Sequence, residues 1–150
     1  HCNRMFREKY AVIASPGFLQ RHPVRNPMDL SNTPVLSLDR EGEWWDKLLG
    51  ALPAKRRPVL RDITMIDNVR GMIDGATAEY GVALVPKYAV LDKLSKGSLV
   101  LLFPRLALLE DAFSIYQRTS RMERYANRTL TRFLLGLDVS GFGDAMSGDS

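Results

Sequence analysis

Short apolar runs rich in β-branched residues alternate along this chain with segments whose apolar residues recur at helical spacing. Apolar runs this short, without polar alternation, are typical of strands that are buried on both faces of a sheet. Strands that alternate with helices indicate βαβ units, in which neighbouring strands are parallel. We therefore expect an α/β fold with a mostly parallel sheet and helices on both faces, its strands lying within residues 10–14, 34–39, 59–66, 82–85, 99–103 and 112–117.

Three positions carry the signature of a helix N-cap. Ser15 precedes Pro16 and Asn26 precedes Pro27, and proline is favoured at the first helical position after a short polar residue. Asn68 precedes a segment whose apolar residues share one helical face. We expect a helix after each cap, with these side chains in the core: Phe18, Leu19, Met28, Leu30, Val69, Met72, Ile73 and Ala76.

Glycine and proline predict where other helices begin and end. Gly81 follows a helical stripe, and we expect it to be the left-handed residue that ends the helix. Of the adjacent Trp44 and Trp45, we expect one to be buried and the other to be partly exposed. The remaining helices are expected over residues 43–52, 86–94 and 122–135.

The composition excludes several classes of protein. Apolar residues make up 45% of the 150 residues and charged residues 25%, as in an ordinary globular domain. No uninterrupted apolar run reaches the roughly 18 residues of a membrane span, and the polar start does not resemble a signal peptide. Cys2 is the only cysteine, so we expect no disulfide within the chain and a reducing, cytoplasmic location.

The net charge of +4 includes two basic clusters. One is Lys55-Arg56-Arg57, in a predicted loop, and the other lies on the outer face of the last predicted helix, between Arg118 and Arg132. A DNA-binding protein gathers its positive charge on one surface. We favour ordinary solvation for both clusters, because charge runs are usually surface features.

Residues suited to catalysis are scarce. The two histidines are His1 and His22, too few for a zinc site of the usual kind, and no Gly-rich phosphate loop is present. His22 precedes Pro23 at the end of a predicted surface helix, which is a poor position for a general base. We therefore expect no enzyme activity, no metal and no cofactor.

Polar side chains follow the apolar strands where an open parallel sheet binds its ligands, beyond the carboxyl ends of the strands. Ser15 follows the first strand, Ser37 and Asp39 end the second, and Asp67 and Asn68 follow the third. A helix start with free N–H groups also attracts anions, so these groups would converge on a small acid or an amino acid. The alternative, that Ser15 and Asn68 only cap their helices, uses the same geometry and stays open.

Six segments match, in order and spacing, the motifs of a known family. They are V-I-A-S-P-G-F-L from Val12, M-D-L from Met28, D-N-V-R from Asp67, G-V-A-L-V-P from Gly81, G-S-L-V from Gly97 and A-F-S-I-Y from Ala112. Over residues 6–137 the chain thereby resembles the effector-binding domain of LysR-type bacterial transcription regulators, which is similar to type 2 periplasmic binding proteins. Trp44-Trp45 and Asn68 resemble the branch with the glycine-cleavage and β-lactamase activators. One departure is Glu79, where the family usually has glycine.

The resemblance implies two α/β lobes joined by two crossover strands. Residues 1–13 would be the crossover strand from a first lobe, 14–112 the second lobe, 113–137 the return strand and a first-lobe helix, and 138–150 a mobile tail. The rest of the first lobe and a winged helix-turn-helix would precede this segment. Without that lobe, we expect the apolar stripe of the last helix to self-associate or to fold back. The stripe consists of Met122, Tyr125, Ala126, Leu130, Phe133 and Leu134.

The resemblance also implies a sensor of a small-molecule effector. The effector would bind between the lobes and bias their arrangement, which changes how the self-associated regulator holds promoter DNA through its winged helix-turn-helix. The residues implied for the cleft are Ser37, Asp39 and Asn68, with Ser15 and Ile66 beside them. Two alternatives stay open: a solute-binding protein of a transport system, and an interaction module with a vestigial cleft.

Overall fold

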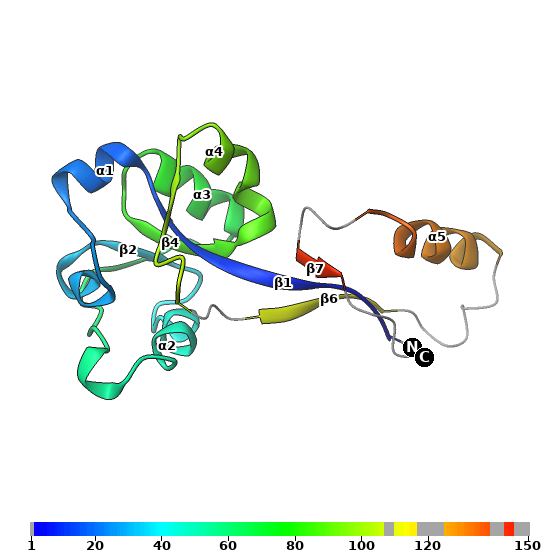
Figure 1. Cartoon of the computed structure of the whole chain (residues 1–150), viewed down its shortest axis with the longest axis horizontal. Helices are drawn as coiled ribbons and strands as arrows, with labels where there is room; N and C mark the ends of the chain where they lie inside the picture. The colour runs from blue at the N-terminus through cyan, green and yellow to red at the C-terminus, as the bar shows by residue number, and fades with distance from the viewer. Residues whose placement is uncertain (1, 107–109, 117–124, 139–142, 146–150) are drawn as a thin grey trace. The chain divides into compact units, whose positions relative to one another are not determined.

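The computed structural model describes residues 2–106, 110–116, 125–138 and 143–145 (Figure 1). In chain order its elements, with η for a 3-10 helix, are β1 (Cys2–Ala14), α1 (Pro16–Arg21), η1 (Pro27–Asn32), β2 (Val35–Ser37), α2 (Glu43–Leu49), η2 (Ala54–Arg56), β3 (Ile63–Met65), α3 (Val69–Thr77), β4 (Val82–Pro86), η3 (Lys87–Val90), α4 (Leu91–Ser95), β5 (Val100–Leu102), β6 (Glu110–Tyr116), α5 (Tyr125–Leu135) and β7 (Gly143–Ala145).

The chain divides into two units, and strand β1 contributes residues to both. Unit 1 consists of His1–Lys9 with Glu110–Ser150, and unit 2 consists of Tyr10–Leu109. β1 continues through the boundary, so its amino-terminal part belongs to unit 1 and Tyr10 to Ala14 belong to unit 2.

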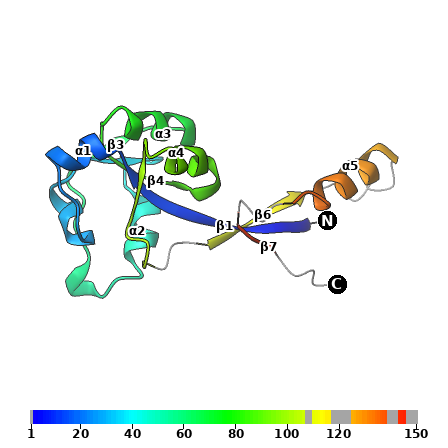
Figure 2. The same ribbon diagram turned by 45° about the horizontal axis from the view of Figure 1, so that its top comes forward.

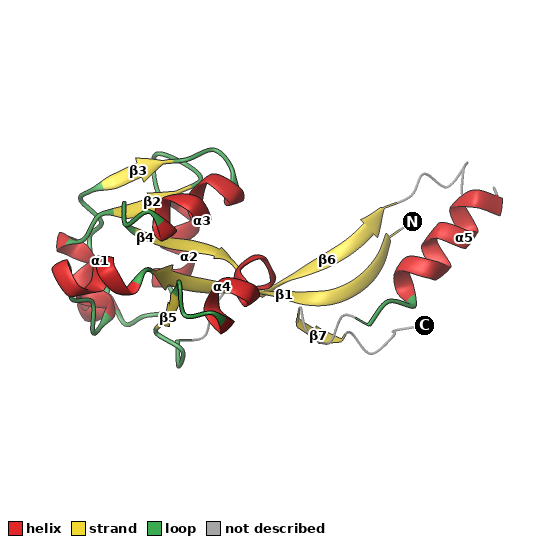
Figure 3. Cartoon of the chain, turned by 90° about the horizontal axis from the view of Figure 1, so that it is seen from above, coloured by secondary structure: helices red, strands yellow, loops and turns green. Residues whose placement is uncertain are grey.

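The sheet of unit 2 has the strand order β3-β2-β4-β1-β5 (Figure 3). β2 is parallel to both β3 and β4, whereas β1 is antiparallel to both β4 and β5. β5 therefore runs in the same direction as β4, and β1 runs against the other four strands of this order. The predicted mostly parallel sheet is confirmed.

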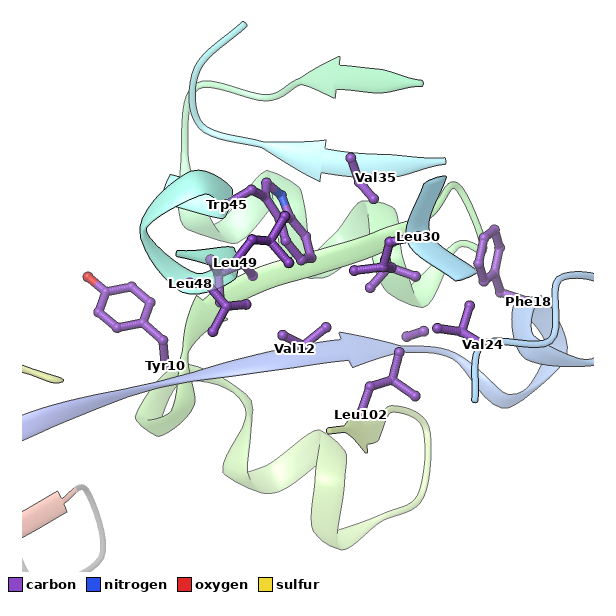
Figure 4. Close-up of a cluster of buried hydrophobic side chains, with 13 residues drawn as sticks. Tyr10, Val12, Phe18, Val24, Leu30, Val35, Trp45, Leu48, Leu49 and Leu102 are labelled. Atoms are coloured by element: carbon purple, nitrogen blue, oxygen red, sulfur yellow. The ribbon is translucent and has the colours of Figure 1, made fainter. Parts of the chain in front are cut away.

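Alternate residues of β1 point to opposite faces of the sheet, as the two-residue period of a strand requires. Tyr10, Val12 and Ala14 belong to one buried cluster, and Ala11 and Ile13 belong to the other. The first cluster is completed by side chains of α1, η1 and α2 (Figure 4): Phe18, Leu30, Trp45, Leu48 and Leu49. The second is completed from the side of α3: Met72, Ile73, Ala76, Val90 and Leu99. α2 and α3 thus cover opposite faces (Figure 2), as the sequence predicts.

The predicted N-caps at Ser15 and Asn26 are confirmed. Ser15 Oγ accepts a hydrogen bond from Phe18 N at 3.2 Å, and Asn26 Oδ1 accepts one from Met28 N at 3.0 Å. The segment after Asn26 is a 3-10 helix, in which Leu30 is fully buried. The prediction that Met28 is also buried was wrong, because its side chain is 44% exposed. Residues two apart on a helix do not share a face.

Helix α3 ends in a left-handed residue, but that residue is Glu79, whose φ is 70°. The prediction that Gly81 has this conformation was wrong. Gly81 is required by a close backbone approach instead, because a Cβ there would lie 2.7 Å from the carbonyl oxygen of Pro34. Val82 N donates to the same oxygen at 3.0 Å. Glu79 in turn forms an ion pair with Arg21 at 2.6 Å.

Strand β3 is much shorter than the predicted run over residues 59–66. It lies at the edge of the sheet and, among the described residues, pairs only with β2, from Val35 opposite Ile63 to Ser37 opposite Met65. Because β2 itself has three residues, it offers no partner to a longer β3. Val59 precedes the strand and is 68% exposed.

Of the two tryptophans in helix α2, one is buried and the other is partly exposed, as the sequence predicts. Trp45 is fully buried, and its Nε1 donates to Leu36 O at 3.0 Å. Trp44 is partly buried and stacks on Tyr10, with 5.3 Å between ring centroids. The helix ends at Leu49, earlier than predicted, and the guanidinium of Arg57 donates to main-chain carbonyls beyond that end, those of Gly50 at 2.9 Å and Leu52 at 2.8 Å. Lys55, Arg56 and Arg57 are exposed, as expected of a solvated cluster.

In unit 1, β1 pairs antiparallel with β6 on one side and with β7 on the other. Arg7 lies opposite both Ala112 and Asp144. No strand was predicted in the tail over residues 138–150, but the structure has strand β7 there, at Gly143–Ala145. An open strand edge pairs through its main chain, whatever the side chains of the partner, so a Gly- and Ser-rich composition does not predict this strand. The other tail residues from 139 onward lie outside the described part of the chain.

Helix α5 begins at Tyr125, and Met122 of its predicted stripe lies outside the described residues. The stripe is uncovered: Tyr125 is 78% exposed, Leu130 55% and Phe133 63%. Arg128 and Arg132 lie one turn apart, on the side of the helix away from Leu130, and are also exposed.

Trp45 is expected to be a main contributor to the stability of unit 2. Trp45→Ala should lower the free energy of unfolding by about 3–5 kcal/mol, because it leaves a large cavity between α2 and the sheet. Trp45→Phe should cost about 1–3 kcal/mol, because it leaves the Leu36 carbonyl without its donor. Trp44→Phe is the matched control, since phenylalanine keeps a stacked ring, and should cost less than either. Urea unfolding followed by circular dichroism measures all three, and equal effects at both tryptophans would contradict the assignment.

Asp29 is expected to make stability depend on pH in the acid range. Hydrogen bonds from Arg25 N at 2.7 Å and Asn26 N at 3.0 Å lower the pKa of this carboxyl below its ordinary value of 3.8. A lowered pKa stabilises the folded state above about pH 4, and this contribution is lost as the pH falls through the folded-state pKa. Asp29→Asn should therefore be less stable than the parent protein at pH 6, and the two should converge below pH 3. A constant difference across urea unfolding curves from pH 6 to pH 2.5 would rule this out.

Candidate functional site

The carboxyl ends of β2 and β3 bring predicted site residues together at one edge of the sheet in unit 2. Ser37 and Met65, the last residues of the two strands, lie opposite one another. Beyond them, Ile66 N donates to Ser37 O at 2.8 Å. Because the strands are parallel, the loops that carry Asp39 and Asn68 leave the sheet at this same edge. We call it the carboxyl edge.

Ser37 and Asp39 are held in place by the main chain. Ser37 is 1% exposed, and its Oγ accepts a hydrogen bond from Asp39 N at 3.4 Å. Asp39 Oδ1 accepts one from Glu43 N at 2.8 Å, in the first turn of α2. Asp39 Oδ2 is buried and has no hydrogen-bond partner among the described residues. One oxygen of this carboxylate therefore fixes the loop to the helix, and the other is unsatisfied.

Asn68 caps α3, the helix that starts from the carboxyl edge. Its Oδ1 accepts a hydrogen bond from Gly71 N at 2.6 Å, and its Nδ2 donates to Asp67 Oδ1 at 2.9 Å. Ile66 covers the same turn, because a Cβ on Gly71 would lie 2.7 Å from Ile66 Cγ2. Asp67 and Asn68 are exposed, whereas Ile66 is partly buried. The predicted cap is confirmed, and it also holds an amide and a carboxylate at the surface of the edge.

Ser15 does not lie with these residues. β1 is antiparallel to β4, and Ile13 lies opposite Ala83, near the start of β4. The end of β1 is therefore at the amino edge of the parallel strands, opposite the carboxyl edge. Ser15 is 4% exposed and caps α1 there. The expectation that Ser15 converges with Ser37 and Asn68 was wrong, because it assumed that β1 runs parallel to its neighbours.

The same register adds residues to the carboxyl edge that sequence reasoning missed. β4 ends there at Pro86, and Tyr10 lies opposite Pro86. The ring of Tyr10 stacks on Trp44, and Lys47 Nζ lies 4.6 Å from the Trp44 ring centroid. Trp44 and Lys47 therefore lie next to Tyr10 at this edge. The position of Pro86 could have been predicted from the sequence, because it directly follows the predicted strand over residues 82–85. The position of Tyr10 could not, since it depends on the direction of β1.

The described residues offer no metal-binding group. No cluster of three or more His, Cys, Asp or Glu side chains among them is arranged to hold an ion. Within the same residues, no helix has the length and apolar character needed to cross a membrane.

Comparison with known proteins identifies the family. The sequence model of the LysR substrate binding domain matches residues 1–137, and the chain therefore belongs to this family. No curated protein sequence matches it significantly. The predictions of a LysR-type effector-binding domain and of a non-enzymatic regulatory domain are confirmed by this membership.

Solved structures agree with the family. The regulatory domain of CrgA from Neisseria meningitidis has 17% sequence identity and a TM-score of 0.76, over 90% of this chain and 67% of that chain. The effector-binding domain of AmpR from Citrobacter freundii has 26% identity and a TM-score of 0.70, over 91% of this chain and 66% of that chain. ArgP from Mycobacterium tuberculosis has 19% identity and a TM-score of 0.74, over 97% of this chain and 49% of that chain. The chain thus spans about half to two thirds of these relatives.

Proposed function

We propose that this chain is the effector-sensing part of a bacterial LysR-type transcription regulator that acts in the cytoplasm. In this function a small acid or amino-acid-like molecule binds between two lobes and controls how the intact protein binds promoter DNA. The observation that carries the proposal is the family match over residues 1–137. The carboxyl edge, where Ser37, Asp39, Ile66 and Asn68 gather, supports a binding role for that part of the chain.

In the proposed function, unit 2 is the second lobe, predicted over residues 14–112, and unit 1 holds part of the first lobe. The course of β1 supports this assignment, because one uninterrupted strand belongs to both units. β6 pairs with β1 over Cys2 to Lys9 and would be the return strand. The remainder of the first lobe and the DNA-binding region would come from the rest of the protein.

A small-molecule effector is supported by one of the similar structures. LysG from Corynebacterium glutamicum, a full-length regulator solved with bound effector Arg, has 16% identity and a TM-score of 0.69 over 90% of this chain and 45% of that chain. For the present protein we propose that Ser37, Asp39 and Asn68 contact the effector, with Ile66 and Asp67 beside them. Ser15 lies at the other edge, and we propose only its capping role.

Asn68 variants test the binding role separately from the capping role. Asn68→Ala removes the cap of α3 and should cost about 1 kcal/mol of stability. Asn68→Ser keeps a good cap but lacks the amide donor, so its stability should stay close to that of the parent protein. If the Asn68 amide binds the effector, both variants should lose about tenfold or more in affinity.

The measurement is a thermal-shift screen of small carboxylic acids and amino acids on the protein at its full natural length, followed by calorimetric titration of any ligand found. An unchanged dissociation constant for Asn68→Ser would leave Asn68 with a structural role alone. If no ligand raises the melting temperature, the interaction module with a vestigial cleft becomes the better interpretation.

Self-association is a further part of the proposal, and it is supported by the exposed stripe of α5. The 150-residue chain should form dimers or larger species at micromolar concentration, and Phe133→Glu should shift it towards the monomer, since a charge on the stripe opposes apolar contact. Arg128→Glu, on another side of the helix, is the matched control and should not. Sedimentation velocity measures both, and a monomeric parent chain would refute self-association through α5.

The solute-binding alternative has the same kind of fold and is distinguished by the coding sequence upstream of His1. A winged helix-turn-helix there supports the regulator. A cleavable signal peptide without a DNA-binding region would support transport instead.

A further inference from the structure

Strand β1 has one edge in unit 1 at which another strand can add to the sheet. In unit 2 the same strand lies between β4 and β5, which pair with its two edges. In unit 1, β6 pairs with one edge of β1 along its length from Cys2 to Lys9. The opposite edge presents a row of main-chain N–H and C=O groups, and a strand edge of this kind is a template for pairing with another chain.

The first part of this opposite edge is irregular. The register between β1 and β6 shifts between Arg4 and Phe6, so Met5 is an extra residue on β1. An extra residue bends the strand and interrupts the regular ladder, which is one of the ways in which natural sheets keep an edge from pairing. The regular part of the edge therefore begins only at Phe6.

Strand β7 covers this regular part (Figure 3). Gly143–Ala145 pairs antiparallel with Phe6 to Glu8, close to the point where β1 enters unit 2. Arg7 and Asp144 occupy directly opposed positions. They are residues of opposite charge, and opposite charges at such positions favour the pairing of two strands, whereas like charges oppose it. The irregularity at Met5 and strand β7 thus follow one another along the same edge.

We propose that Gly143–Ala145 is a protective strap, which keeps the open edge of β1 closed to strands of other molecules. Because the strap belongs to the same chain, its effective concentration at the edge is higher than that of a strand on another molecule. A strand of three residues is held by few hydrogen bonds, so the strap can open. The exposed edge then accepts an extended segment of a second copy of the chain. This inference does not depend on the effector.

Truncation of the tail tests the strap. The 150-residue chain carries Phe133→Glu throughout, so that contacts through α5 do not contribute to association. A chain that ends at Phe142 lacks the strap, and a chain that ends at Met146 keeps it and is the matched control. Sedimentation velocity at micromolar concentration should show dimers or larger species for the shorter chain and a monomer for the control.

Amide hydrogen exchange locates the effect on β1. It is measured by mass spectrometry with fragmentation to single residues, at a concentration at which both chains are monomeric. Alternate N–H groups of a strand point to opposite edges. Among Phe6, Arg7 and Glu8, the N–H groups that point to β7 should exchange at least about tenfold faster in the shorter chain, because they lose their acceptors. Those that point to β6 should not change, whereas general fraying of unit 1 would accelerate both sets.

Charge exchange tests the strap in a chain of unchanged length. Arg7→Asp and Asp144→Arg each place like charges at opposed positions, so each should accelerate exchange at the β7-facing N–H groups by about threefold or more and promote association. The double variant, with both substitutions, should restore slow exchange and the monomer. Far-ultraviolet circular dichroism should be the same for all four proteins, which separates opening of the strap from unfolding.

Three results would overturn the proposal. Equal exchange rates in the chains that end at Phe142 and Met146 would show that β7 does not hold the edge. Faster exchange at the β7-facing N–H groups without association would show that the strap pairs with β1 but protects nothing. In the protein at its full natural length, equal exchange rates with and without residues 143–150 would show that another segment covers the edge.

Discussion

The fold of unit 2 depends on strand β1, which lies between β4 and β5 and is buried there on both faces. Val12, Ile13 and Ala14 of β1 have no exposed surface, and their side chains enter both core clusters. β1 pairs with β4 on one side and with β5 on the other. The register of β1 therefore decides which residues of these two strands face α2 and which face α3. A shift of one residue would exchange the two faces along the whole strand. Both cores therefore require β1 in this register.

The carboxyl edge follows from the shortness of the strands around it. β2 and β3 have three residues each, so the chain turns away from the sheet directly after Ser37 and Met65. The polar groups that follow are held by main-chain hydrogen bonds, as at Asp39 and Asn68, and so need little further ordering to bind a ligand. The short strands also have a cost in stability, because one oxygen of Asp39 is buried without a donor from the described part of the chain. Binding sites commonly keep such locally unfavourable features.

Features encoded within a few residues were predictable from the sequence, and those set by distant contacts were not. The caps at Ser15, Asn26 and Asn68 depend only on neighbouring N–H groups, and the uniform burial of Val82–Pro86 follows from its composition. The close approach of Gly81 to Pro34 required knowledge of which strands are neighbours. The length of β3 was set by β2 in the same way. Of the candidate site, the residues after two parallel strands were predicted correctly as neighbours, whereas Ser15 was misplaced.

The reversed direction of β1, which removes Ser15 from the carboxyl edge, brings Tyr10 to it. Tyr10 is the first residue of unit 2, at the point where β1 continues into the other unit. Its ring stacks on Trp44, which directly follows Glu43, the residue whose N–H binds Asp39 Oδ1. The contacts from Asp39 to Tyr10 are thus continuous and pass through the first turn of α2. A ligand shifts a conformational equilibrium only by its difference in affinity for the two arrangements. In the proposed function, an effector that contacts Asp39 binds next to the first turn of α2, and this turn is linked through Trp44 to Tyr10, the first residue of unit 2.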